Sequence, residues 1–284
     1  MKKLLLIIIT IILIGCQKEL EAERACFVSV EEFTYLSNDD ENIPFSQEHQ
    51  STRISDCWIT FNGIFLGAFD MPSTIPVLFE GEINAILSPG IKVNGTALNR
   101  IIYPFYKEYE ISTEIHFDEN IILNPTTEYK ENTNFKLLEE GTFELGNMLE
   151  KTENSDTIPF TQNEEVFQGQ KSCAIHIDSE NPFFQIRNIE SLFFENYFES
   201  IFIELDFKSS IPFRVGLITN ENLDNRQEHM IIFESNEWKK MYLDISPLIG
   251  PEGAVSSYQI YFEGSLPENT ESGFVLLDNI KIVH

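Results

Sequence analysis

The sequence has few basic residues for its length. It contains 19 lysines and arginines against 46 aspartates and glutamates, which gives a formal net charge of −27 at pH 7. A chain with this excess of carboxylates repels nucleic acids and anionic lipid headgroups. The composition therefore excludes a DNA- or RNA-binding protein, and it leaves the chain able to attract divalent cations.

Cysteine is also scarce. The chain has Cys16, Cys26, Cys57 and Cys173, and none of their spacings matches a CxxC metal or redox site. Cys26 and Cys57 lie in the first half and could pair if the compartment is oxidising. Cys173 lies in the alternating segment SCAIHID, where a buried, unreactive thiol is expected.

Catalytic signatures are missing as well. The sequence has no GxSxG, no HExxH and no glycine-rich phosphate loop, and its five histidines are not spaced as metal ligands on one element. We therefore expect no enzyme and no catalytic residues. A glycan-active hydrolase stays an alternative, because its two carboxylates carry no local sequence signature.

A short apolar run opens the chain. Residues 4–15 follow two lysines and are apolar except for Thr10. Twelve helical residues rise roughly 18 Å, which is less than the roughly 30 Å of bilayer hydrocarbon. The run fits the apolar region of a secretory signal, so residues 1–15 are predicted to be a signal peptide.

The residues that end this run are LIGC, at positions 13–16. They resemble a bacterial lipobox, and that resemblance implies cleavage before Cys16 and attachment of fatty acids to its thiol. The next residues, QKE, resemble the export signal of Bacteroidetes-type surface lipoproteins. We expect an outer-membrane lipoprotein of the cell envelope that faces outward; a plain signal peptide followed by a polar tether is the alternative.

The remaining sequence favours an all-β protein. Short alternating runs such as residues 109–117, YEISTEIHF, are typical of half-buried antiparallel strands, and Asn62-Gly63 predicts a hairpin turn. No long amphipathic helix is present, and 24 phenylalanines supply core residues. We predict two β-sandwich domains, the second a jelly-roll. The predicted segments are a tether with an N-terminal strand region (16–53), a first sandwich (54–123), a linker (124–134) and a second sandwich (135–284).

Two resemblances accompany this division. Residues 54–87 contain a strand–NG–strand–GAF unit followed by IPVLFEGEINAIL, and they resemble the PEGA domain. This domain family is found on bacterial surfaces and has no agreed catalytic activity. The second half has an FxGxxS segment, then a tryptophan-led strand ending in LDIS, then a last strand carrying LDNI. This order resembles the jelly-roll of carbohydrate-binding modules and galactose-binding-like domains, and it implies binding of a glycan or a surface partner.

Asp278 is a candidate metal ligand. It shares the parity of the apolar residues Phe274, Leu276, Ile280 and Ile282 in the last strand, and a buried carboxylate has to be paired or bound to a metal. In the modules that this half resembles, a carboxylate on the last strand often helps to hold a structural Ca²⁺. That resemblance implies calcium bound by Asp278 with Glu139 or Glu140. The alternative is a bulge that turns Asp278 outward or toward a backbone amide; no other cofactor is expected.

Sugar binding requires aromatic faces and a few planar polar groups. Arg214, Gln259 and Tyr261 fall on the strand face opposite the inferred core, so they are the candidate ligand-binding residues, whereas Trp238 is expected to pack structurally. The predicted function is a non-catalytic, lipid-anchored envelope protein that binds a glycan or a surface partner. A structural accessory subunit of an envelope assembly is the alternative. An aromatic-lined polar groove would favour glycan binding, and an exposed apolar patch would favour the accessory subunit.

Overall fold

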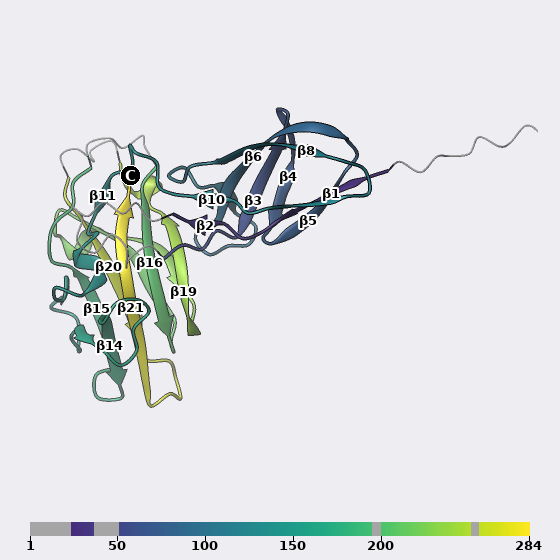
Figure 1. The fold of residues 1–284 in the computed structure, drawn as a ribbon. Helices are drawn as coiled ribbons and strands as arrows, with labels where there is room; N and C mark the ends of the chain where they lie inside the picture. The colour runs from purple at the N-terminus through teal and green to yellow at the C-terminus, as the bar shows by residue number, and fades with distance from the viewer. Residues whose placement is uncertain (1–23, 37–50, 195–199, 251–255) are drawn as a thin grey trace, which may run out of the picture.

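The computed structural model describes residues 24–36, 51–194, 200–250 and 256–284, which form two β-sandwiches in contact with each other (Figure 1). The predicted signal peptide, Cys16 and the QKE segment lie outside the described residues. In the described ranges, no helix is long and apolar enough to cross a membrane.

The first sandwich is built from two sheets. One has the order β5 (Ser73–Val77), β1 (Cys26–Val30), β9 (Asn120–Leu123). The other has the order β4 (Ile64–Asp70), β3 (Asp56–Phe61), β6 (Gly81–Lys92), β7 (Arg100–Ile102), and β8 (Tyr109–Ile115) pairs with the first half of β6. Asn62 and Gly63 have φ of 49° and 79°, as the predicted hairpin turn between β3 and β4 requires.

The boundaries of this first domain differ from the predicted ones. Strand β1 supplies core residues between β5 and β9, so the sandwich starts at Cys26 rather than at residue 54. At its other end, β10 (Thr126–Thr127) pairs in parallel with β2 (Thr34–Tyr35), and Tyr129 bridges to Tyr106. Residues 126–130 are therefore bound to the first domain and are not a free linker, because their backbone groups have partners there.

The second sandwich also has two sheets, and all their strand pairs are antiparallel. The first has the order β13 (Phe160–Gln162), β14 (Ser172–Asp178), β21 (Ser272–Val283), β16 (Phe202–Ser209), β19 (Ser235–Asp244), and β11 (Phe135–Lys136) pairs with the end of β21. The second has the order β12 (Leu149–Lys151), β15 (Phe183–Asn188), β20 (Tyr258–Ser265), β17 (Phe213–Thr219), β18 (Arg226–Ile232). The 3-10 turns are η1 (Glu140–Thr142), η2 (Leu223–Asn225) and η3 (Ser246–Leu248).

Apart from the adjacent pairs β13–β14 and β17–β18, successive strands of this second domain cross between its two sheets, as in a jelly-roll. Its core consists of the inward-facing residues of both sheets, such as Ile203, Leu205 and Phe207 of β16 and Ile260 and Phe262 of β20. The predicted fold class, all-β with two sandwich domains, is confirmed.

The described cysteines are unpaired. Cys26, Cys57 and Cys173 are buried free thiols, so the pairing of Cys26 with Cys57 is not what the structure shows. Cys26 instead donates its thiol to the carbonyl of Phe79 at 2.8 Å. Burial raises the pKa of Cys57 to about 12, so this thiol stays protonated and unreactive.

The two sandwiches meet at one edge of the second domain (Figure 1). Val93, just after β6, forms a parallel bridge with Tyr242 of β19, and the Asn94 amide donates to the Tyr242 carbonyl at 2.8 Å. A separate apolar cluster fills the interface: Ile91, Val93, Tyr103 and Tyr106 from the first domain, with Phe202 and Tyr242 from the second. This packing fixes which part of the second domain is covered by the first.

Candidate functional site

The outer face of the sheet β13–β14–β21–β16–β19 carries the polar and aromatic residues of interest. Strand β16 sends Ile203, Leu205 and Phe207 into the core. Because strand residues alternate between faces, Glu204, Asp206 and Lys208 lie on the outer face. This face has two halves: one is covered by the first domain and the other is open.

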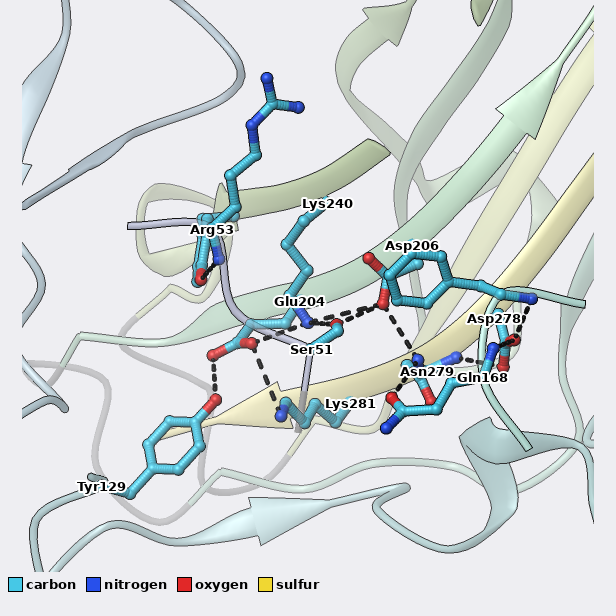
Figure 2. A network of polar contacts seen from close by, with 12 residues as sticks. Ser51, Arg53, Tyr129, Gln168, Glu204, Asp206, Lys240, Asp278, Asn279 and Lys281 are labelled. Carbon is cyan, nitrogen blue, oxygen red and sulfur yellow. Dashed lines mark hydrogen bonds and ion pairs between the residues drawn. The ribbon is translucent and has the colours of Figure 1, made fainter. Parts of the chain in front are cut away.

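The covered half holds buried charges, shown in Figure 2. Lys240 Nζ lies 3.1 Å from Glu204 Oε2 and 3.9 Å from Asp206 Oδ2, and Lys281 Nζ lies 3.6 Å from the same Glu204 oxygen. The side chains of the two acids are fully buried and those of the two lysines are 3% exposed. We call Glu204, Asp206, Lys240 and Lys281 the junction cluster.

The first domain supplies hydrogen-bond donors to the acids of this cluster. The hydroxyls of Tyr103 and Tyr129 each donate to Glu204 Oε1 at 2.7 Å, and Ser51 donates to Asp206 (Figure 2). Burial opposes ionisation of Glu204, but the charges of Lys281 and Lys240 and the hydroxyls of Tyr103 and Tyr129 together outweigh it, so the pKa of Glu204 is lowered. Because buried ions require such partners, the cluster holds the two domains in one orientation.

Asp278 lies beside this cluster, but it is not built as a calcium ligand. Its Oδ2 accepts the backbone amides of Phe167 and Gln168, both at 3.2 Å, and its Oδ1 accepts the amide of Asn279 at 2.8 Å. Burial raises the pKa of Asp278 to about 7. A carboxylate that faces three N–H donors does not fit a site that needs oxygen ligands around a cation.

The other predicted calcium ligands do not fit either. Glu139 and Glu140 are exposed at the start of η1, whose Gly141 lies against the carbonyl of Ile280. In the part of the chain that the structure describes, no group of three His, Cys, Asp or Glu side chains could hold a metal ion.

The predicted alternation of inward- and outward-facing residues in the last strand is interrupted at Asn279, whose φ is 48°. Val275 and Leu277 face the core before this bulge, and Ile280 and Ile282 face it afterwards. Asp278 is therefore turned toward backbone amides, as the alternative interpretation of the sequence expects.

The open half of the face contains a groove. It has a volume of about 410 Å³ and is lined by Phe160, Thr161, Gln162, Asn163, Glu164, Glu165, His176, Phe274 and Leu276. Phe160 of β13 pairs with Ala174 of β14, and His176 pairs with Phe274 of β21, so these rings lie on one face. The ring centroids of Phe160 and His176 are 5.4 Å apart, and Phe160 is 42% exposed. We call this feature the aromatic groove.

Further aromatic side chains lie on the same face. The ring of Trp238 on β19 packs against the ring of Phe167, with 5.7 Å between the ring centroids, and both side chains are at least partly exposed. Lys208 of β16 forms an ion pair with Glu165 at 2.6 Å, which connects the groove-lining loop to the centre of the sheet. Trp238 thus packs against another ring, as expected, but it does so on the outer face.

The three predicted ligand-binding residues lie together on the other sheet. Arg214 of β17 pairs with Glu263 of β20, and Gly216 pairs with Tyr261. Gln259 precedes Tyr261 by two residues in β20, so the two side chains lie on the same face. Tyr261 and Gln259 are only 3% and 2% exposed. The Tyr261 ring lies over Gly216, where a Cβ atom would come within 2.7 Å of it.

Polar contacts occupy most of this second face. Arg187 donates to Gln259 Oε1 at 3.1 Å, and Arg214 forms an ion pair with Glu228 at 3.0 Å. The side chain of Arg214 is 42% exposed, so it is the one member of the predicted trio that is open to solvent. Ligand contact by the trio stays a prediction, but the burial of Gln259 and Tyr261 makes this face less accessible than the aromatic groove.

Sequence reasoning did not select Phe160, His176 or Phe274. The alternation of SCAIHID places His176 opposite the buried Ile175 and Ile177, which would have identified an outward ring. That Phe160 and Phe274 flank it depends on the strand order β13–β14–β21, which the sequence does not contain.

Carbohydrate-binding modules are among the solved structures similar to this chain. A family 11 module of the cellulosomal cellulase Lic26A-Cel5E of Clostridium thermocellum shares 14% identity, with a TM-score of 0.32, over 47% of this chain and 85% of that one. CBM28, a module specific for non-crystalline cellulose, shares 12% over 51% and 94%, with a TM-score of 0.38. A carbohydrate-binding module of the β-sandwich superfamily shares 12% over 92% and 98%, with a TM-score of 0.37.

No protein-family model matches the chain, and no curated protein matches it.

Proposed function

We propose that this protein is a lipid-anchored, non-catalytic envelope protein that binds a glycan in the aromatic groove. The observation that supports this is the groove itself, in which Phe160, His176 and Phe274 lie beside amide and carboxylate side chains. Aromatic rings pack against the apolar C–H faces of sugars, and planar polar groups orient the hydroxyls. Its volume of about 410 Å³ lies within the usual range of small-molecule pockets, roughly 300–1,000 Å³.

The charge of the groove favours an uncharged glycan. Glu164 and Glu165 line it, and the chain carries a net charge of −27. Carboxylates at the site and a negative overall field both repel polyanionic saccharides. A neutral glycan is therefore the ligand class that we propose.

The same carboxylates argue for binding rather than hydrolysis. A glycosidase places two carboxyl groups on opposite sides of the scissile bond, roughly 5–10 Å apart. Glu164 and Glu165 are neighbours in one loop, and the carboxylate of Glu165 is held by Lys208 at 2.6 Å. These two side chains are thus not arranged as an acid and a nucleophile around a bond.

The experiment is a glycan array with the full chain, followed by calorimetry on any neutral glycan that binds. Phe160→Ala removes an exposed ring from the groove, and we expect it to weaken binding about tenfold, as loss of a contact at the centre of a site does. Phe233→Ala is the matched control, since Phe233 is 72% exposed and does not line the groove.

Two outcomes would contradict the proposal. One is the absence of binding to every neutral glycan on the array. The other is equal affinity of the wild type and Phe160→Ala, which would place the ligand elsewhere; Arg214→Ala would then test the face of the opposite sheet.

A second candidate function, an accessory subunit of an envelope assembly, is favoured by strand β4. Among the described strands it pairs with β3 alone, and its residues Ile64, Phe65 and Leu66 are 67%, 55% and 38% exposed. An apolar edge strand offers unpaired backbone groups to a strand of another protein. Crosslinking in intact cells tests this function: wild type should give a defined adduct that Phe65→Lys removes, and identical adducts in both would contradict it.

A further inference from the structure

A second cavity lies where the two domains meet, near the edge strand β19. It has a volume of about 180 Å³. Side chains of both domains line it, among them Arg53, Ser55 and Lys92 from the first and Lys239, Lys240 and Tyr242 from the second. We call it the basic pocket, because four of its lining residues are cations.

These cations are not all neutralised. Lys240 is paired with Glu204 in the junction cluster, and Lys92 Nζ lies 3.7 Å from Asp70 Oδ1. Arg53 and Lys239 are exposed, and neither has an ion pair with any residue in the described ranges. Among the described residues, Arg53 and Lys239 therefore carry positive charge to the basic pocket without an ion-pair partner.

The position of Arg53 is fixed by the second domain. Its backbone amide donates to the hydroxyl of Tyr242 at 2.9 Å, and Tyr242 is itself buried and in contact with the hydroxyl of Tyr106 at 3.1 Å. Figure 2 shows that the guanidinium of Arg53 points away from the junction cluster. Its donors have no hydrogen-bond or ion-pair partner in the described part of the chain.

Such a pocket is unusual in this chain. The protein has only 19 basic residues against 46 acidic ones, yet four of the basic ones line one small cavity. An arginine fork and lysine ammonium groups bind oxyanions with short, charge-assisted hydrogen bonds. The hydroxyl of Ser55 lines the same cavity but donates to Asp56 Oδ2 at 2.6 Å, so the donors to a ligand are those of the cations.

We propose that the basic pocket binds a small oxyanion, of the class of sugar carboxylates, sulfate and phosphate. The ligand is held by Arg53 and Lys239, with Lys92 as a third cation. Because the walls come from both sandwiches, the bound anion also bridges the domains. This site is separate from the aromatic groove, and it does not depend on glycan binding there.

The test is isothermal titration calorimetry of the full chain with glucuronate, inorganic sulfate and inorganic phosphate in separate runs, at constant ionic strength. Glucose is the neutral control. We expect at least one of the three anions to bind with a dissociation constant of about 1 mM or tighter. Any heat from glucose belongs to the aromatic groove and should be the same in the wild type and in the basic-pocket variants. Glucuronate binding alone indicates a sugar acid as the ligand, and sulfate or phosphate binding alone indicates an inorganic or esterified anion.

Three variants locate the site. Arg53→Gln and Lys239→Gln should each weaken anion binding about tenfold, the usual effect of losing one charged hydrogen bond, and Lys92→Gln serves as a further variant if one of these does not fold. Lys151→Gln is the control, because Lys151 is exposed on β12 and does not line the basic pocket. The proposal is overturned if none of the three anions binds, or if the pocket variants bind as tightly as Lys151→Gln.

Discussion

Tyr103 of the first domain donates its hydroxyl to Glu204 of the second domain at 2.7 Å, and both residues are fully buried. Tyr129 donates to the same oxygen, while Lys240 and Lys281 approach the other. A charged group surrounded in this way has no water to replace a lost partner. The junction cluster thus makes the first domain a fixed cover for half of one sheet, and it leaves the aromatic groove as the open half.

Removal of the Tyr103 hydroxyl tests this coupling. Tyr103→Phe should lower the free energy of unfolding by about 1–3 kcal/mol, since it leaves Glu204 with one donor fewer in a dry environment. Chemical denaturation monitored by circular dichroism measures the loss. Tyr109→Phe is the control, because Tyr109 packs against the core of the first domain and its hydroxyl makes no hydrogen bond with the described residues. Equal losses in the two variants would show that the hydrogen bond to Glu204 adds no stability.

Glu204→Gln makes a stronger prediction for the same cluster. The substitution keeps the shape of the side chain but leaves Lys240 and Lys281 without their shared carboxylate. Breaking a buried ion pair from one side costs about 3–5 kcal/mol, so the variant should unfold at a much lower denaturant concentration than Tyr103→Phe. A midpoint equal to that of the wild type would contradict the buried pairing.

How far the sequence anticipates these features depends on the residue. The alternation in SIFIELDFK correctly separates Ile203 and Leu205 from Glu204 and Asp206. It cannot show that the polar face meets a second domain rather than water, because that depends on contacts more than seventy positions away, such as Tyr129 with Glu204. Outward polarity in one strand is compatible with both situations.

The last strand shows a different limit. Strict alternation places Asp278 with Ile280 and Ile282, but the positive φ of Asn279 shifts the register and turns Asp278 to the loop amides. Asparagine adopts this conformation more readily than most residues, so Asp-Asn in a strand is a signal for a bulge. The backbone amides that donate to the Asp278 carboxylate belong to Phe167 and Gln168, and no local sequence pattern connects these residues with the last strand.

Asp278 should make stability depend on pH. Burial raises its pKa from 3.8 to about 7 in the folded state, so between about pH 4 and 7 the folded protein binds more protons at this group than the unfolded chain. The contribution of Asp278 to stability is therefore present at low pH and is lost as pH rises toward 7. In Asp278→Asn this decline should be absent, which thermal melts from pH 4 to 7 can measure. If the difference between wild type and variant is constant over that range, the raised pKa is wrong.

Calcium should have little effect on stability. The oxygens of Asp278 are taken by backbone N–H donors, and Glu139 and Glu140 are exposed on η1. We therefore expect the same melting temperature in millimolar Ca²⁺ and in EDTA, with Mg²⁺ as the control for ionic strength. A specific rise with Ca²⁺ that Asp278→Asn removes would restore the calcium site implied by the sequence resemblance.

The membrane anchor is tested at Cys16. The residues LIGC at positions 13–16 predict that the thiol of Cys16 carries fatty acids after cleavage. Each buried methylene contributes about 0.8 kcal/mol, and more than one acyl chain is needed for stable attachment. Cys16→Ser should therefore move the protein from the membrane fraction to the soluble fraction, and mass spectrometry should show that the wild type lacks residues 1–15 and carries acyl mass. Cys26→Ser is the control, because Cys26 is buried in the first domain. Sedimentation of Cys16→Ser with the membranes, together with an unmodified wild-type mass, would rule out the anchor.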